Sequence, residues 1–112
     1  MNTIDVGKEF YHRLANRNKS QGDGEHTAEE FREKYLKFLD NENAWTINTE
    51  SIVLNFKNVK KIGPSFANEA FAYFTKYAKE EQIFMKIKIE EASIVQMEII
   101  RLEIKAGYNT KW

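Results

Sequence analysis

One stretch, residues 52–74, constrains the fold more than any other part of the chain. It opens with Ile52–Phe56, which is apolar at almost every position, as is typical of a strand covered on both faces. A short polar link follows and ends at Gly63-Pro64-Ser65. A helix is predicted over residues 65–79, because serine is a favoured N-cap residue and proline is tolerated just outside the first turn. The stretch therefore predicts a buried strand joined to a helix.

Two further helices and two further strands are predicted from capping patterns and hydrophobic periodicity. Thr27 and Glu30 have the spacing of a capping box, and residues 27–39 carry apolar side chains at helical intervals. A third helix is expected over residues 93–106, capped by Ser93 and ended by Gly107. Residues 83–89 alternate as a strand does, residues 2–10 show a weaker alternation, and residues 11–26 are expected to form a surface loop. The buried face of the third helix is predicted to consist of Val95, Ile99, Leu102 and Ala106.

The alternation of strands and helices indicates an α/β protein. A chain of 112 residues suits one hydrophobic core, so a single small domain is expected over residues 1–112. We expect a mixed β-sheet of about three to five strands packed by about three helices.

The composition excludes several classes of function. The 17 basic and 17 acidic residues give a formal net charge of zero, which does not favour nucleic acid or an anionic membrane as partner. The chain has no cysteine, so disulfides and thiolate metal sites are excluded. The first residues lack the pattern of a signal peptide, and no apolar run approaches the ~20 residues of a membrane helix. The cytoplasm is the expected location.

No catalytic or metal-binding motif accompanies the predicted fold. His12 and His26 have no metal-ligand spacing, and no GxSxG nucleophile motif is present. The acidic pairs at residues 80–81 and 90–91 are adjacent in sequence, so their side chains do not share a helix face. We therefore expect a protein that is not an enzyme and that uses neither a metal nor a cofactor.

Two regions have alternative interpretations. Arg13, Arg17 and Lys19 precede a glycine-containing turn that ends at Gly24. This segment is either a solvated surface loop or an anion-binding loop, although it matches no phosphate-binding pattern. The third helix also carries a surplus of apolar residues, which is either buried under the N-terminal segment or forms the seam with a partner or of a homodimer.

The residues around the Gly-Pro-Ser corner resemble a known family. VLNF at residues 53–56, Val59, Ile62 and SFANEAF at residues 65–71 are similar to the signature of the STAS-like domain family, a bacterial family related to the STAS domains of anti-sigma factor antagonists. The earlier segment, with Gly24-Glu25 and the run EFR at residues 30–32, is similar to the N-terminal part of that family. The resemblance spans nearly the whole chain, but only residues 53–71 are specific.

The resemblance implies a regulatory role. Partner-switching STAS proteins carry a serine at the start of the matching helix, and its phosphorylation by an anti-sigma kinase releases that kinase. Ser65 is the matching position, and it implies a phosphorylation or partner-docking site made of Ser65, Gly63, Pro64, Asn68 and Glu69. The antagonists read Asp-Ser-Ser-Gly where this chain reads GPSF at residues 63–66, so Ser65 is either a switch or only a helix cap.

Three hypotheses of function follow. The first is a non-enzymatic interaction module that docks a protein partner at the Ser65 end of the second helix, the partner being a histidine-kinase-like ATPase or another regulator. The second is a small inhibitor encoded by a phage or mobile element, which blocks a host enzyme by binding to it. The third is a nucleotide- or small-ligand-binding domain that uses the Arg13–Gly24 loop.

Overall fold

A three-stranded parallel sheet forms the base of the molecule. The computed structural model describes residues 2–17, 25–46 and 50–109. The sheet has the order β1–β3–β5, built from β1 (Asn2–Asp5), β3 (Ile52–Asn55) and β5 (Ile87–Glu90). The strands β2 (Arg13–Leu14) and β4 (Lys61–Ile62) form a separate parallel pair. The predicted α/β class is confirmed, and the described residues form five strands in two parallel sheets in place of one mixed sheet.

The strand β3 lies at the centre of the main sheet, as its apolar sequence predicts. Leu54 lies between Ile4 of β1 and Ile89 of β5, and its side chain is fully buried in the core. Val53 points to the opposite face, between Thr3 and Lys88, and is buried as well. Burial on both faces explains why this strand reads as a continuous apolar run.

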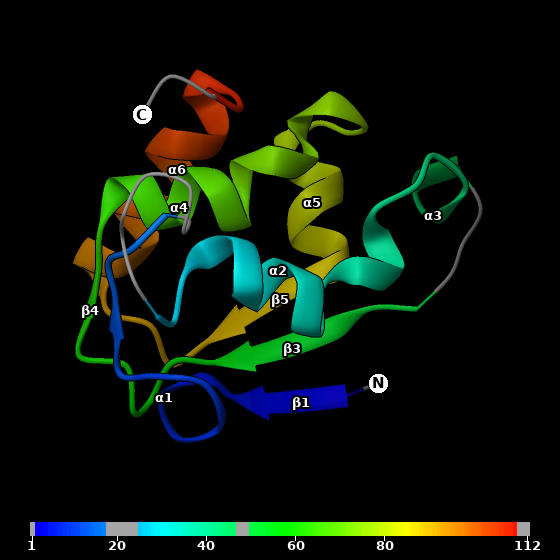
Figure 1. Ribbon diagram of the computed structural model, residues 1–112. Coiled ribbons are helices and arrows are strands. Elements are labelled where there is room, and N and C mark those ends of the chain that lie inside the picture. The colour runs from blue at the N-terminus through cyan, green and yellow to red at the C-terminus, as the bar shows by residue number, and fades with distance from the viewer. Residues whose placement is uncertain (1, 18–24, 47–49, 110–112) are drawn as a thin grey trace.

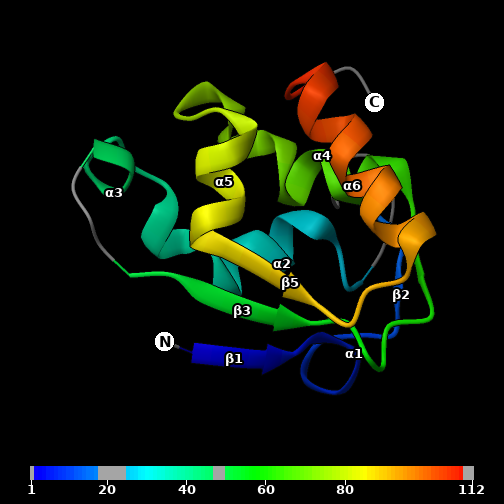
Figure 2. The same cartoon turned by 180° about the vertical axis from the view of Figure 1, so that it is seen from behind.

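The longer helices cover one side of the main sheet, as Figures 1 and 2 show for α2, α4, α5 and α6. The core between these layers is rich in aromatic rings, among them the fully buried Phe31, Phe66 and Phe71. The helical segments in chain order are α1 (Val6–Glu9), α2 (Ala28–Tyr35), the 3-10 turn η2 (Lys37–Leu39), α3 (Asn43–Thr46), α4 (Pro64–Ala70), the 3-10 turn η3 (Ala72–Lys76), α5 (Glu80–Lys86) and α6 (Ile94–Ala106).

Two predicted strands are shorter than expected. Ile83–Lys86 belongs to α5, and the strand begins only at Ile87. Both Ile83 and Ile87 are buried, and a spacing of four residues satisfies a helix face as well as a strand alternation. At the N-terminus the strand ends at Asp5, which caps α1 by accepting a hydrogen bond from the amide of Lys8. Gly7 lies in this short helix, not in a strand.

The helix that follows the Gly-Pro-Ser corner differs from the prediction in two ways. It ends at Ala70, where η3 takes over, and it begins at Pro64 with Gly63 as its N-cap residue. The prediction of Ser65 as N-cap is wrong. The Ser65 hydroxyl instead donates a hydrogen bond to the carbonyl of Ala15, 3.1 Å away. The cause is a long-range contact, because residues 13–15 run alongside this corner.

The caps of α2 and α6 are confirmed, but the buried face of α6 is not the predicted one. The hydroxyl of Thr27 accepts from the amide of Glu30, and Ser93 and Gln96 form a reciprocal capping box before α6. The buried side chains of α6 are Gln96, Ile100 and Ile104, whereas the predicted core residues Val95 and Leu102 are exposed. The helix is rotated because the Gln96 amide donates to the carbonyl of Val59, 3.2 Å away, which brings a polar residue into the buried stripe.

Candidate functional site

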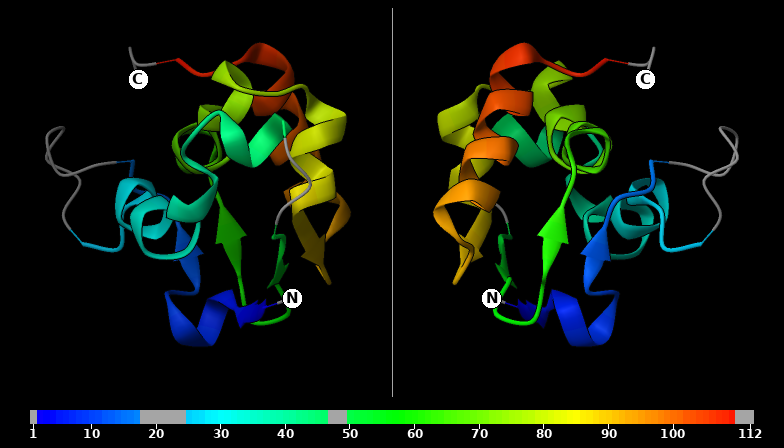
Figure 3. Two further views of the ribbon diagram at one scale, coloured as in Figure 1. Left: turned by 90° about the vertical axis from the view of Figure 1, so that its right-hand side faces the viewer. Right: turned by 90° about the vertical axis from the view of Figure 1, so that its left-hand side faces the viewer.

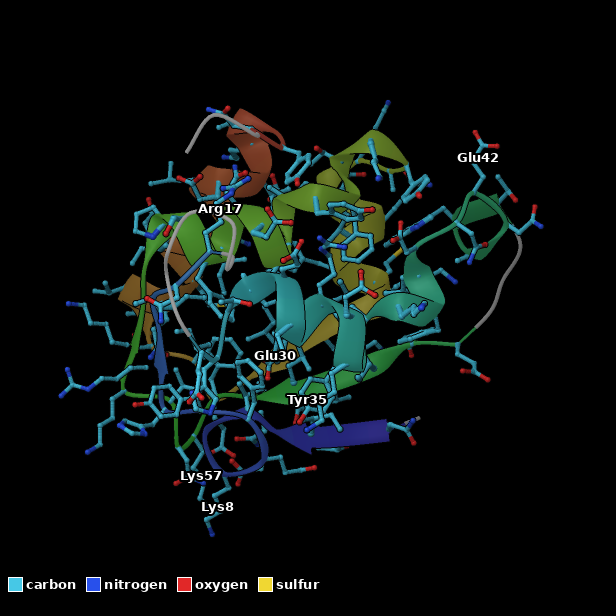
Figure 4. The ribbon with its side chains drawn as sticks, viewed as in Figure 1. Lys8, Arg17, Glu30, Tyr35, Glu42 and Lys57 are labelled. Carbon is cyan, nitrogen blue, oxygen red and sulfur yellow. The ribbon has the colours of Figure 1, made fainter. Side chains whose placement is uncertain are left out.

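A buried polar network lies beneath α4, and Glu69 is at its centre. The Glu69 side chain is 4% exposed and its carboxylate binds two guanidinium groups, Arg17 Nε at 3.1 Å and Arg32 Nη2 at 2.6 Å. Arg32 also donates from Nε to the backbone carbonyl of Glu69. The hydroxyl of Tyr108 donates to both carboxylate oxygens, at 3.1 and 3.2 Å. Figure 4 shows Arg17 lying against α4. The buried carboxylate of Glu69 therefore links three parts of the chain: the segment that follows β2, helix α2 and the C-terminal segment.

The neighbouring residue, Asn68, extends the network toward the C-terminal end of α6. Its side-chain oxygen accepts from both Nη atoms of Arg17 at 3.3 Å and from the amide of Asn109 at 2.9 Å. Its side-chain nitrogen donates to Glu103 Oε1 and to the carbonyl of Gly107, at 3.1 and 3.0 Å. Arg17 also donates to the carbonyl of Asn109. Because donors and acceptors are matched, the hydrogen bonds of the network offset the desolvation penalty of burying these groups.

On its other side the network reaches a tyrosine–carboxylate cluster. The guanidinium of Arg32 lies 3.7 Å from the ring centre of Tyr73, and the hydroxyls of Tyr73 and Tyr77 donate to Asp40 at 2.8–2.9 Å. Burial raises the pKa of Tyr73 to about 12, together with the hydrogen bond to Asp40. Burial alone would raise the pKa of Asp40, but the two tyrosine hydrogen bonds and the charges of Lys76 and Arg32 outweigh it, so this pKa is lowered. Tyr108 also has a raised pKa, from burial and the Glu69 carboxylate.

Three of the sequence-predicted site residues belong to this network. Arg17, Asn68 and Glu69 are at most 3% exposed, so their side chains are not offered to a partner or a nucleotide at the surface. Arg32, Tyr73 and Tyr108 were missed. A sequence signal did exist, because Asn68-Glu69 interrupts an otherwise apolar helix, and a carboxylate at such a position requires a buried cationic partner.

The exposed candidates gather at a second place, which we call the β2–β4 corner and define as Arg13, Ala15, Lys60, Lys61, Gly63, Pro64 and Ser65. Figure 3 shows β2 and β4 side by side, leading into α4. Arg13 lies opposite Lys61 in the parallel register, and the amide of Gly63 donates to the carbonyl of Leu14 at 2.8 Å. The hydrogen bond of Ser65 to Ala15 fastens the start of α4 to the same strand.

The surface of the β2–β4 corner is basic. Arg13, Lys60 and Lys61 are exposed, Pro64 and Ala15 are exposed beside them, and Ser65 and Gly63 are half-buried. In the part of the chain that the structure describes, no carboxylate lies within ion-pair distance of Arg13, Lys60 or Lys61. The structure thus places Arg13 on the strand that leads to Ala15, the acceptor of the Ser65 hydrogen bond, and it buries Arg17, while Lys19 lies outside the described residues.

The described residues contain neither a candidate metal site nor a membrane-spanning helix. Within residues 2–17, 25–46 and 50–109, no group of three or more His, Asp or Glu side chains is placed to hold a metal ion. None of the helices in these ranges is both long and apolar enough to span a bilayer.

Comparison with known proteins identifies the family of this chain. Searches of curated proteins and of solved structures found nothing similar to this chain. A family model described as a STAS-like domain of unknown function (DUF4325) matches residues 27–94, from the cap of α2 to the first residue of α6. The matched range includes β3, the Gly-Pro-Ser corner, α4 and β5, and it holds most of the buried hydrophobic residues. The chain therefore belongs to the STAS-like domain family.

Proposed function

We propose that this chain is a non-enzymatic regulatory module that docks the acidic surface of a partner protein at the β2–β4 corner. The observation that carries the proposal is the placement of Arg13 opposite Lys61, with Lys60 next to it and, among the described residues, no carboxylate within ion-pair distance. Like charges on paired strands are destabilising. A partner that supplies carboxylates relieves this repulsion and gains electrostatic steering in addition.

The Ser65 hydroxyl provides a site of regulation within this surface. It is half-buried and bonded to the carbonyl of Ala15 in the unmodified protein. A phosphate on Ser65 removes the donor of that bond and adds about two negative charges beside Arg13 and Lys61. The added charge neutralises the basic corner, so an acidic partner is released. By the resemblance to anti-sigma factor antagonists, the partner is a histidine-kinase-like ATPase or another regulator.

Affinity capture from a lysate of the source organism tests this proposal. The wild type is compared with Arg13→Glu/Lys61→Glu and with Ser65→Asp, which places a negative charge at the switch position. We expect both variants to capture at least about tenfold less of the partner, and the wild-type capture to weaken as salt is raised. Lys88→Glu is the matched control, because Lys88 is equally exposed but lies on β5 in the other sheet.

The measured outcomes separate docking from switching. Equal capture by the wild type and by Arg13→Glu/Lys61→Glu would exclude the corner as the docking surface. Loss of capture with the charge-reversal variant but not with Ser65→Asp would keep the docking surface and reject the switch. Circular dichroism of each variant establishes that the loss is not caused by unfolding.

A further inference from the structure

The helix α6 presents an apolar surface to solvent. Among the residues that the structure describes, four large apolar side chains are exposed, and three of them are on this helix: Ile94 at 88%, Val95 at 68% and Leu102 at 54%. The opposite face of α6 is occupied by Gln96, Ile100 and Ile104, which are buried. The exposed side is therefore not a displaced core face, and nothing in the described chain covers it. In Figure 2 the outer side of α6 faces the viewer beside α5.

The apolar residues share this face with charges of both signs. We call the face the α6 seam and define it as Ile94, Val95, Glu98, Arg101, Leu102 and Lys105, all of them exposed. Their spacing of three and four residues places them along one side of the helix. Glu98 and Arg101 form no ion pair with each other or with another described residue, so both charges are open to a partner.

We propose that the α6 seam binds a second copy of the same chain, as an antiparallel pair of α6 helices related by a twofold axis at the level of Ile100. In such a pair, two residues from different copies lie at the same height along the helices when their numbers add up to 200. Glu98 of one copy then lies level with Leu102 of the second copy. Arg101 of the second copy is one residue further along, so it is displaced from Glu98 by about 1.5 Å along the helix axis. Leu102 of one copy approaches Leu102 and Val95 of the second copy. Glu98 of each copy forms an ion pair with Arg101 of the other copy. The pair formed by Glu98 and Arg101 is thus complementary to itself, as an isologous interface requires.

The seam is small, so the dimer is weak. Its length is that of the thirteen residues of α6, about 20 Å. An interface of one helix per subunit falls at the low end of specific interfaces, where association is reversible. Dimerisation is therefore expected to depend on concentration and to be visible by sedimentation equilibrium between low micromolar and submillimolar protein. This interface is separate from the β2–β4 corner, and its test does not depend on the proposed partner.

A charge-swap experiment on the full chain tests the proposal. Leu102→Asp removes the central apolar contact, and Glu98→Arg or Arg101→Glu places like charges opposite each other. Each single change is expected to raise the dissociation constant of the dimer at least about tenfold. The double variant Glu98→Arg/Arg101→Glu restores opposite charges in both pairs and is expected to dimerise within about threefold of the wild type. Glu42→Arg is the matched control, because Glu42 is exposed beside α3, away from α6 (Figure 4).

Each outcome decides for or against the seam. A wild type that stays monomeric over the whole concentration range overturns the proposal. A dimer that is unaffected by Leu102→Asp shows that another surface is used. If the single charge reversals weaken the dimer and the double variant does not recover, the antiparallel register is wrong. Circular dichroism is measured for all variants, since these side chains are exposed and their replacement should leave the fold intact.

Discussion

At the scale of single residues, Glu69 is the side chain on which the interior depends most. It is the buried carboxylate that two buried guanidinium groups share, and it is 4% exposed. Burying ions costs more than their mutual attraction returns unless the geometry is good and the remaining hydrogen bonds are made. Here Tyr108 and the backbone carbonyl of Glu69 complete the set. The ion cluster is therefore expected to fix how the segments meet more than to add net stability.

Neutralising Glu69 should be costly. Glu69→Gln preserves the size of the side chain but leaves Arg17 and Arg32 buried without their common counter-charge. We expect a loss of about 3–5 kcal/mol in the free energy of unfolding, measured by urea denaturation. Glu33→Gln is the comparison, because Glu33 also lies near Arg32, at 3.6 Å, but its side chain is 52% exposed. That change should cost about 0.5 kcal/mol or less. Similar losses for the two variants would contradict the special role of Glu69.

The raised pKa of Tyr73 predicts that the free energy of unfolding decreases at alkaline pH. Burial and the hydrogen bond to Asp40 raise its pKa from 10.0 to about 12. The folded state thus holds the proton more tightly than the unfolded state, and the stabilisation is fully present below pH 10. It is lost as pH rises from 10 to 12. Tyr73→Phe cannot titrate, so its unfolding free energy should fall less steeply over this interval than that of the wild type. Equal slopes would show that Tyr73 ionises alike in both states.

At the scale of helices and strands, local signals set some element ends and distant contacts set others. Ser93 and Thr27 cap their helices as the sequence predicts, because a cap needs only residues within one turn. The start of α4 was not predictable in this way, since the Ser65 hydroxyl is bonded to Ala15, fifty residues away in sequence. The boundary between α5 and β5 was mistaken because Ile83 and Ile87 fit both periods. Local chemistry predicts caps and central strands, and tertiary contacts decide the rest.

The contrast between Ser93 and Ser65 is testable with the same two substitutions at each site. Ser93→Ala removes the acceptor for the amide of Gln96 and should cost about 1 kcal/mol, whereas Ser93→Asp keeps a good cap and should cost only a few tenths. Ser65→Ala loses one donated bond, about 0.5–1.5 kcal/mol. At high salt, which screens the attraction of a carboxylate to Arg13 and Lys61, Ser65→Asp should cost at least as much as Ser65→Ala, because a carboxylate cannot donate to the Ala15 carbonyl. Stabilities come from thermal or urea unfolding, and a rescue by aspartate at Ser65 would mean that it is a cap after all.

At the scale of the whole molecule, the buried network joins parts that lie far apart in the chain. Arg17 and Asn68 are 51 residues apart, and Arg17 and Asn109 are 92 residues apart. The sequence shows that Glu69 and Asn68 are polar residues in an apolar helix, but it does not show which arginines and which terminal segment meet them. A prediction from the sequence therefore places Asn68, Glu69 and Arg17 at the surface, whereas all three are buried. Their burial leaves the β2–β4 corner and the α6 seam as two separate exposed surfaces on a framework that the buried network holds together.

The last prediction concerns how that framework holds the C-terminal segment. The Asn68 side chain accepts a hydrogen bond from the amide of Asn109 and donates one to the carbonyl of Gly107. Asn68→Leu should therefore release this segment while the sheet stays folded. Native-state hydrogen exchange should show the Asn109 amide exchanging at least about tenfold faster relative to the Leu54 amide of the central strand. The ratio corrects for any global loss of stability. Asn16→Ala is the control, because among the described residues the Asn16 side chain makes one hydrogen bond, an exposed one to the carbonyl of Glu25. If the exchange rates of both amides rise by the same factor, the C-terminal segment unfolds only together with the core, and Asn68 does not hold it locally.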